Sequence, residues 1–352
     1  MRAWSFACLL VVVSPVSAQS YKAVKDWIGG CDNTRHCTLI GLASADSDSP
    51  AMLHFERSGE PSAEIEQITL RVDVPLSRED HYALELDAKE RVLEVEQAHL
   101  RSAEDDPERL DLVLTRPEEI ARILAALRRA QTVTLVGDSG AVGTISLSGA
   151  SAIMLWVDEQ QQRLGTTTAL VRKGPQPASS VPLPPPAPPL LSTPGSSALP
   201  EAAAKAAGAQ VRGTLEPDTC EALEPDSPQS DYAWKLPDGR TLVQLSCSAG
   251  AYNFISRWYL VRRGETPLAI SFPMPVSGEG RPETELELVN AEFMPETGTI
   301  SSYALGRGIG DCGSSASWTW DGEAFQLQSY ALMDDCRGVS AEFWPTLWRS
   351  AD

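Results

Sequence analysis

The stretch DWIGGCDNTRHC, residues 26–37, concentrates side chains that could do chemistry. Cys31, His36 and Cys37 could supply three zinc ligands, but structural zinc sites use four, commonly from two closely spaced pairs. No second pair is present, and the other histidines are scattered. A redox dithiol favours Cys-x-x-Cys spacing, whereas five residues separate these cysteines. The pattern favours a disulfide-closed loop with a surface histidine, and we expect no metal ion and no cofactor.

His36 and Ser139 are the residues that a serine-protease interpretation would use, because RHC precedes GDSG as in chymotrypsin-like enzymes. That mechanism needs a base, a buried carboxylate that orients it and an oxyanion hole. Ser139 instead lies between two β-like runs, where the flanking Gly137, Asp138 and Gly140 suit a hairpin turn. The sequence therefore predicts no catalytic residue, and enzymatic activity stays uncertain.

Asp311, Trp318 and Trp320 are the candidate binding residues. Asp311 in GIGDCG, with the pair Asp334 and Asp335, could hold calcium, but no EF-hand or repeat spacing is present. The ordinary interpretation is an acidic turn beside a cysteine. Trp318 and Trp320 are two residues apart and share one face of a strand. Exposed, they could stack on sugars or on an apolar patch of a partner; buried, they belong to the core, which is commoner for aromatic residues.

Residues 1–18 have the features of a secretory signal peptide. Arg2 provides a positive start, Ala7–Val13 an apolar run, and Val16–Ala18 a small-residue cleavage site. The apolar run is shorter than the ~20 residues of a membrane span, and no later segment is apolar enough to cross a bilayer. We expect a protein of the periplasm of a Gram-negative type cell, or a secreted one, with Cys8 removed with the signal.

Six cysteines remain in the mature chain, and an even number in an exported protein indicates disulfide bonds. Six cysteines allow fifteen pairings, among which the sequence does not choose. Pairing each cysteine with its sequence neighbour keeps every bridge inside one domain. This simplest hypothesis gives the bridges Cys31–Cys37, Cys220–Cys247 and Cys312–Cys336.

A proline-rich stretch divides the chain. Ten prolines fall between residues 175 and 200, which disfavours helix and sheet and favours extended polyproline II. The following EAAAKAA is a helix former that acts as a spacer. We therefore expect a signal peptide over 1–18, an N-terminal domain over 19–173, a stiff linker over 174–211 and a C-terminal domain over 212–352.

The N-terminal domain is predicted to be α+β, with a mixed β-sheet and two helices. Residues 65–74 alternate at period two, which indicates a half-buried strand. Residues 115–130 form the strongest helix, with Ile120, Ile123, Leu124 and Leu127 on one face. Thr115 and Glu118 fit a capping box before this helix. Further strands are expected over 36–44 and 51–57, a hairpin across 137–140, and a second helix over 149–165.

The C-terminal domain is predicted to be mostly antiparallel β, as a sandwich or an open barrel. Short apolar runs alternate with turns rich in Gly, Pro and Asp. Hairpins are expected across PETG, residues 295–298, and across DGE, residues 321–323. No repeat of 20 to 50 residues is present, which excludes a propeller or a solenoid.

The formal net charge is -19, and both halves of the chain are acidic. Proteins that bind polyanions gather Lys and Arg on one surface. The longest basic clusters here are LRRA and VRRG, on a predicted helix and at the end of a predicted strand. We therefore expect no nucleic acid as a partner.

Several motifs give the chain a resemblance to a family of exported bacterial proteins, domain of unknown function 1176. They are KDWIGGCDNTRHC, ISLSGASAIMLWVDEQQQRLGTTTAL, GAYNF, GRGIGDCG followed by WTWDGEAFQL, and CRG. The resemblance covers nearly the whole mature chain and implies a periplasmic protein with six cysteines, without implying catalytic residues. The first domain also resembles the invasion-associated locus B proteins, which share a Trp shortly before an early Cys and a late SLSGASA-like turn.

The sequence favours a non-catalytic exported protein that binds a component of the cell envelope or another exported protein. No catalytic constellation is recognised, while a proline-rich connection and an aromatic-rich β domain suit an interaction role. An envelope hydrolase with an inter-domain site is the alternative, because such a site leaves no linear motif. A structural or stress-protective secreted protein is the third hypothesis.

Overall fold

The computed structural model describes residues 20–47, 49–217, 219–220, 230–275 and 283–351. The expected signal peptide and Cys8 lie outside these ranges. Within them the structure is mostly β, with three α-helices and several antiparallel sheets, none of which closes on itself. This agrees with the expected α+β class. No helix of the described ranges is long and apolar enough to cross a membrane.

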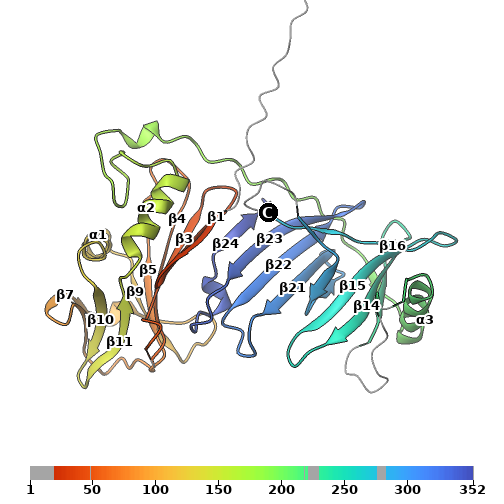
Figure 1. Ribbon diagram of the computed structural model, residues 1–352, viewed down its shortest axis with the longest axis horizontal. Coiled ribbons are helices and arrows are strands. Elements are labelled where there is room, and N and C mark those ends of the chain that lie inside the picture. The colour runs from red at the N-terminus through yellow and green to blue at the C-terminus, as the bar shows by residue number, and fades with distance from the viewer. Residues whose placement is uncertain (1–19, 48, 218, 221–229, 276–282, 352) are drawn as a thin grey trace, which may run out of the picture.

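The N-terminal half contains two sheets and two helices around one apolar core (Figure 1). The larger sheet has the order β1-β2-β3-β4-β5-β9-β8 and the smaller β11-β10-β6-β7. Every described pairing in them is antiparallel, so the expectation of a mixed sheet is wrong. The bounds are β1 Ser20–Val24, β2 Trp27–Cys31, β3 Cys37–Leu42, β4 Ala51–Arg57, β5 Ile68–Val72, β6 Tyr82–Leu86, β7 Glu90–Val95, β8 Leu100–Ser102, β9 Leu110–Leu114, α1 Pro117–Ala126, β10 Thr132–Gly137, β11 Gly140–Ser146 and α2 Ala150–Gln160.

Helix α1 presents its expected apolar face to the core. Ile120, Ile123 and Leu127 are buried, and Leu124 is half-buried. The expected capping box is wrong, because the helix begins at Pro117 and its N-cap is Arg116, which makes no side-chain cap bond. Arg116 instead pairs with Glu119 in the first turn, at 2.9 Å.

Helix α2 ends at Gln160, earlier than the expected Gly165. The chain leaves the helix because Gln161 and Arg163 turn into a buried polar network, and Gln162 takes a left-handed φ of 57°. Such a φ is uncommon outside glycine and marks a backbone held by its surroundings.

Strand β5 differs from its expected half-buried form, because all five of its residues are buried. One face meets the N-terminal core through Ile68 and Leu70. On the other face Arg71 is covered by the C-terminal half and bonded to Ser340 and Glu342. The alternation in the sequence is real, but the polar face is closed by tertiary contacts.

The C-terminal half consists of open antiparallel sheets with an aromatic core. One sheet runs β12-β13-β14-β15-β16, with β19 also on β15; another runs in order from β20 to β24; and β17 pairs with β18. The hairpins across 295–298 and 321–323 are confirmed by the β20–β21 and β22–β23 pairings. The bounds are β12 Ser197–Ala198, α3 Glu201–Arg212, β13 Tyr232–Lys235, β14 Thr241–Ala249, β15 Phe254–Val261, β16 Leu268–Ala269, β17 Phe272–Pro273, β18 Thr284–Glu285, β19 Glu287–Val289, β20 Glu292–Met294, β21 Thr299–Leu305, β22 Gly313–Trp320, β23 Phe325–Met333 and β24 Thr346–Arg349.

The proline-rich segment runs from α2 across the molecule to α3 and contacts the C-terminal half on the way (Figure 1). Ser192 donates to the carbonyl oxygen of Thr297 at 2.7 Å, and Pro189 forms a parallel bridge with Ala351. Helix α3 packs on β13 and β14 through the buried Ala204 and Val211. The expected linker boundary at residue 211 therefore falls inside α3, and the expected spacer helix is part of the C-terminal half.

The three disulfides join sequence neighbours, so that pairing hypothesis is confirmed. Cys31–Cys37 closes the loop between β2 and β3, and Cys220–Cys247 connects the segment after α3 to β14. Cys312–Cys336 lies beside the contact between the two halves, where Cys312 is fully buried.

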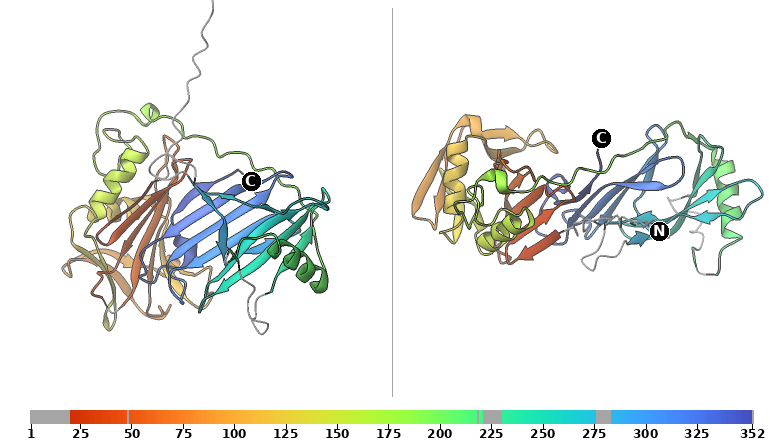
Figure 2. Two further views of the ribbon diagram at one scale, coloured as in Figure 1. Left: turned by 45° about the vertical axis from the view of Figure 1, so that its right-hand side comes forward. Right: turned by 90° about the horizontal axis from the view of Figure 1, so that it is seen from above.

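The two halves share a buried apolar cluster and lie side by side (Figure 2). Ile40 and Met52 of the large N-terminal sheet pack with Met333 and Trp344 of the C-terminal half. The backbones approach so closely that a Cβ on Gly30 would lie 2.4 Å from that of Pro345. This approach requires glycine in the opening motif.

Arg71 makes a buried ionic contact between the halves. Its guanidinium donates to Asp111 through Nε at 2.8 Å and Nη2 at 2.7 Å. Its Nη1 donates to Glu342 at 2.6 Å, and the group lies 4.5 Å from the ring centre of Phe343. Removing one partner of such a buried ion pair is strongly destabilising, because the other charge is left buried without a counter-charge.

We expect Arg71→Ala to lower the free energy of unfolding by about 3–5 kcal/mol, because the buried Asp111 would lose its partner. The matched Arg129→Ala, which removes an exposed ion pair with Glu90, should have a much smaller effect. Urea unfolding followed by tryptophan fluorescence measures both. Equal losses in the two variants would contradict this role of Arg71.

Candidate functional site

A groove of about 770 Å³ opens in the N-terminal half between α1, the connection from β4 to β5, and residues 167–173. Its volume lies within the range of small-molecule and peptide sites, about 300–1,000 Å³. Its lining mixes apolar and charged side chains, so both shape and charge contribute to what it can hold.

Helix α1 forms the floor of the groove. The side chains that line the groove form a row along the helix, beside the row that faces the core. Ala121, Leu124, Ala125 and Arg128 line the groove at spacings i, i+3, i+4 and i+7. Both alanines are exposed, and their small side chains leave the space open. The sequence signal for this second row is that the apolar residues of α1 cover more of the helix surface than packing against one core requires.

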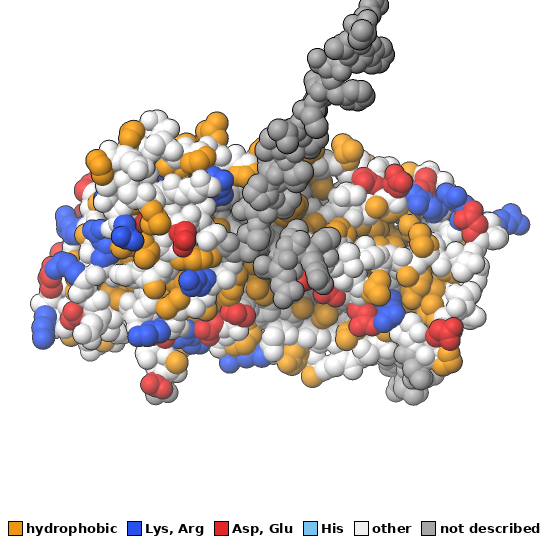
Figure 3. Space-filling model, turned by 45° about the horizontal axis from the view of Figure 1, so that its top comes forward, with side chains coloured by type: hydrophobic (Ala, Val, Ile, Leu, Met, Phe, Trp, Pro, Cys, Tyr) orange, Lys and Arg blue, Asp and Glu red, His pale blue; other side chains and the backbone are white. Residues whose placement is uncertain are grey.

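Charged side chains of opposite sign line the groove. Glu60, Glu64 and Glu66 come from the connection between β4 and β5. Arg128 comes from the end of α1, and Lys173 from the segment after α2. Surface charges of both signs are dispersed in the same way over the face seen in Figure 3, without a gathered basic patch. A ligand that carries both signs matches such a rim better than a polyanion.

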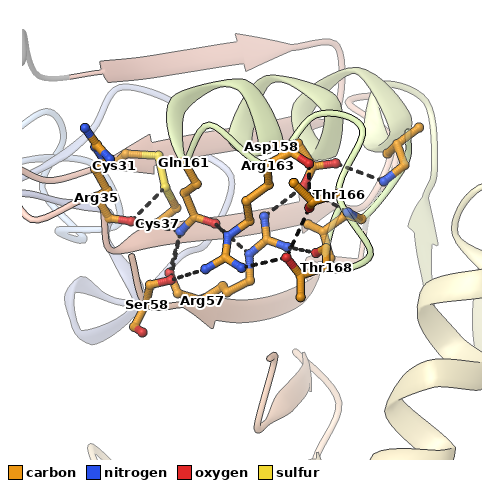
Figure 4. A network of polar contacts seen from close by, with 12 residues as sticks. Cys31, Arg35, Cys37, Arg57, Ser58, Asp158, Gln161, Arg163, Thr166 and Thr168 are labelled. Carbon is orange, nitrogen blue, oxygen red and sulfur yellow. Dashed lines mark hydrogen bonds and ion pairs between the residues drawn. A yellow bond between two sulfur atoms is a disulfide. The ribbon is translucent and has the colours of Figure 1, made fainter. Parts of the chain in front are cut away.

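A buried polar network, drawn in Figure 4, adjoins this groove, and its members Arg57 and Thr168 belong to the lining. Arg57 Nη2 donates to Asp158 at 2.8 Å, and Arg57 Nε donates to Gln161 at 2.6 Å. Asp158 and Gln161 are 0% exposed and Arg57 is 2% exposed. Burying a charged group costs desolvation free energy. The network is therefore stable only because its charged groups are paired and hydrogen-bonded.

Arg163 brings a second guanidinium into the network. It donates to the Gln161 side-chain oxygen at 3.1 Å, to Thr168 Oγ1 at 3.0 Å and to the carbonyl oxygen of Pro61 at 2.9 Å. Burial and the neighbouring Arg57 lower the pKa of Arg163 to about 10. It therefore remains charged at neutral pH, and this cluster of two arginines and one aspartate carries a net charge of about +1.

The network fixes the walls of the groove. Asp158 accepts the backbone N–H groups of Leu170 at 2.9 Å and Val171 at 3.0 Å. Gln161 donates to the carbonyl oxygen of Ser58 at 3.1 Å and to that of Arg35, inside the disulfide loop, at 2.8 Å. Because these guanidinium groups are buried and bonded within the protein, they hold the groove walls in place, and Arg57 also reaches the lining.

His36 has a partner that the sequence did not indicate. Its Nε2 lies 3.0 Å from Glu56, and His54 Nε2 lies 3.6 Å from the other carboxylate oxygen. Burial raises the pKa of Glu56, but the hydrogen bond with His36 and the nearby imidazole of His54 outweigh it and hold that pKa well below its usual range. Across the described residues, no group of three or more His, Cys, Asp or Glu side chains is placed to hold a metal ion.

The tryptophans proposed as a binding platform lie in the core. Trp318 and Trp320 are each 1% exposed, and both pack against aromatic neighbours. Neither indole ring offers a face to a ligand. Their placement agrees with the core interpretation.

The Asp311 carboxylate is fully engaged by hydrogen bonds from two segments of the chain. Its carboxylate accepts from Arg307 Nε at 2.6 Å and from the backbone N–H of Gly338 at 2.7 Å. The hydrogen bond from Arg307 is the main cause that lowers the pKa of Asp311. The carboxylate thus connects the two segments that carry Cys312 and Cys336.

Ser139 occupies the expected hairpin turn between β10 and β11. His36 precedes β3 in the other sheet, where it contacts Glu56. The two residues of the protease interpretation are therefore on different sheets and do not form a catalytic pair.

The model of one protein family, described as protein of unknown function (DUF1176), matches residues 21–351. The chain belongs to this family. It is also 30% identical over 380 residues to the uncharacterized protein YpfG of Escherichia coli strain K12, across 97% of this chain and 96% of that protein. No solved structure matches the chain. The family match spans the groove, the network and all three disulfides.

Asp158→Asn should lower the free energy of unfolding by about 3–5 kcal/mol, because the buried Arg57 would lose its charged partner. The amides of Leu170 and Val171 should also exchange hydrogen faster, since one of their acceptors is lost. The exposed Asp46→Asn is the matched control and should change neither result. Unchanged exchange at residues 170 and 171 would refute the positioning role of Asp158.

Glu56→Gln should flatten the dependence of stability on pH in acid. The pKa of Glu56 is lower in the folded than in the unfolded protein, so its contribution is present above about pH 4.3 and is lost as pH falls further. The gap in unfolding free energy between wild type and Glu56→Gln should therefore shrink below that pH. Urea unfolding at a series of pH values measures it, and a gap that widens in acid would contradict the assignment.

Proposed function

We propose that this protein is a non-catalytic binding protein of the cell envelope that holds a segment of an exported polypeptide in its N-terminal groove. The observation that carries the proposal is the groove itself, about 770 Å³ with an apolar floor on α1 and walls held by the buried network. Preformed walls favour binding because little ordering is needed when a ligand arrives.

The chemistry of the lining favours a polypeptide over other ligands. An apolar floor suits hydrophobic side chains, and the rim offers carboxylates and cations for residues of either sign. A lipid with an anionic head would be matched by Arg128 and Lys173 but opposed by Glu60, Glu64 and Glu66. The net charge of -19 further disfavours a polyanion.

Export is supported by the cysteines and by the start of the sequence. All six cysteines beyond residue 18 are paired in disulfides, a state typical of proteins outside the reducing cytosol. Residues 1–18 have the charge, apolar run and cleavage site of a signal peptide. These features support a periplasmic or secreted location.

The lining of the groove also favours binding over hydrolysis. It contains serines and threonines but no histidine or cysteine among the residues the structure describes there. A serine nucleophile requires a base within hydrogen-bond reach. The hydrolase hypothesis therefore gains no support from this groove.

A photo-crosslinking residue in place of Ala125 should capture a discrete exported polypeptide in cells, because this side chain lies on the groove floor. Adding Ala121→Arg to the same chain should abolish the crosslink, since the long side chain would fill the groove. Arginine is nearly as good a helix former as alanine, so α1 should persist. Mass spectrometry of the crosslinked product identifies the bound segment.

The matched control places the same crosslinker at Ala206, which is exposed on α3. It should give no such product. Equal capture from both positions, or capture at 125 that survives Ala121→Arg, would refute the groove as the binding site.

A further inference from the structure

A second groove, of about 420 Å³, lies in the C-terminal half and is separate from the proposed peptide site. Strands β13, β14 and β15 form one side, and residues 290–293 form the other. Its lining includes Tyr232, Trp234, Gln244, Ser248, Asn290 and Glu292. The combination is aromatic and polar, unlike the apolar floor on α1.

The aromatic side of this groove is a rigid stack. Tyr232 packs on Trp234 with ring centres 6.1 Å apart, and Trp234 packs on Trp258 at 5.8 Å with an interplanar angle of 14°. Trp258 is buried, whereas Tyr232 is 44% exposed. The stack therefore holds a partly exposed ring in one orientation at the edge of the core.

The opposite wall is fixed by Asn290. This residue has a left-handed φ of 47°, and its side chain accepts the N–H of Phe254 at 2.8 Å and donates to the carbonyl oxygen of Tyr303 at 2.9 Å. Asparagine adopts this left-handed conformation readily in turns, and the hydrogen bonds of its side chain fix the turn against β15 and β21. Both walls are thus preformed.

The charges of the lining narrow the class of ligand. Glu292 is the single ionisable acid in the described lining, which contains no Lys, Arg or His. An anion would find no counter-charge there. The other polar groups are neutral hydroxyls and amides, which donate and accept hydrogen bonds.

We propose that this groove binds a neutral glycan, with a sugar ring on Tyr232 and its hydroxyls bonded to the exposed Ser248 and Glu292. A sugar presents an apolar C–H face and a polar rim, which matches an aromatic surface edged by hydroxyls and amides. The volume falls within the range of small-ligand sites. A quaternary ammonium ligand would also suit an aromatic ring beside a carboxylate, and it is the competing occupant that the test below includes.

The test titrates the whole mature chain with tetramers of glucose, α- or β-1,4-linked, and of N-acetylglucosamine, and follows tryptophan fluorescence and calorimetric heat. At least one tetramer should bind with a dissociation constant below about 10 mM. Tyr232→Ala should raise that constant at least about tenfold, whereas Tyr232→Phe should keep it within about twofold. Tyr252→Ala is the matched control, because Tyr252 is 41% exposed and lies outside the groove.

Ser248→Arg provides a second variant that does not depend on the aromatic stack. Ser248 is exposed, so an arginine there should leave the fold intact and block the groove. Circular dichroism and thermal unfolding verify that each variant folds. Because Ala125 and Ala121 play no part, failure here is distinguishable from failure of the peptide site.

Three outcomes would overturn the proposal. The first is that no tetramer binds the wild-type chain. The second is that binding survives both Tyr232→Ala and Ser248→Arg, which would place the sugar elsewhere. The third is that choline binds while every sugar fails, which would assign the groove to a cationic ligand.

Discussion

The burial of charge behind the N-terminal groove is the constraint on which this half of the protein depends. Arg57, Asp158 and Arg163 are excluded from water, which is stable only if each is bonded in good geometry. Meeting that requirement joins the end of β4, the end of α2 and residues 168–171. The same contacts stop α2 early and set the walls of the groove. The network thus positions the walls of the groove while its charged groups remain almost fully buried.

In the described structure the two halves are in direct contact as well as connected by the proline-rich segment. A shared apolar cluster, the Arg71 contacts and the close approach of Gly30 to Pro345 join them. The opening motif takes part, because the Asn33 side chain exchanges two hydrogen bonds with the backbone of Arg349, at 3.0 and 2.9 Å. One proposed groove lies in each of these two contacting halves.

Features with local causes were predictable from the sequence. The core face of α1 follows from helical spacing, and the hairpins follow from turn residues between β-like runs. The disulfides join neighbours, as the simplest pairing suggested. Errors arose where distant contacts intervened. The second face of β5 is closed by the C-terminal half, and α3, expected as a spacer, packs on β13 and β14. For Trp318 and Trp320, composition alone left burial and binding both open.

The sequence by itself determined the strands and helices, the family and the exclusion of familiar catalytic motifs, because these follow from patterns within short windows. Only the tertiary structure decided which partner His36 has, that two arginines are buried, and that both grooves exist. The physical reason is distance along the chain. Arg57 and Asp158 are 101 residues apart, and Asn33 and Arg349 are 316 apart. No local pattern records which charged side chains will meet after folding, and that meeting shapes the site.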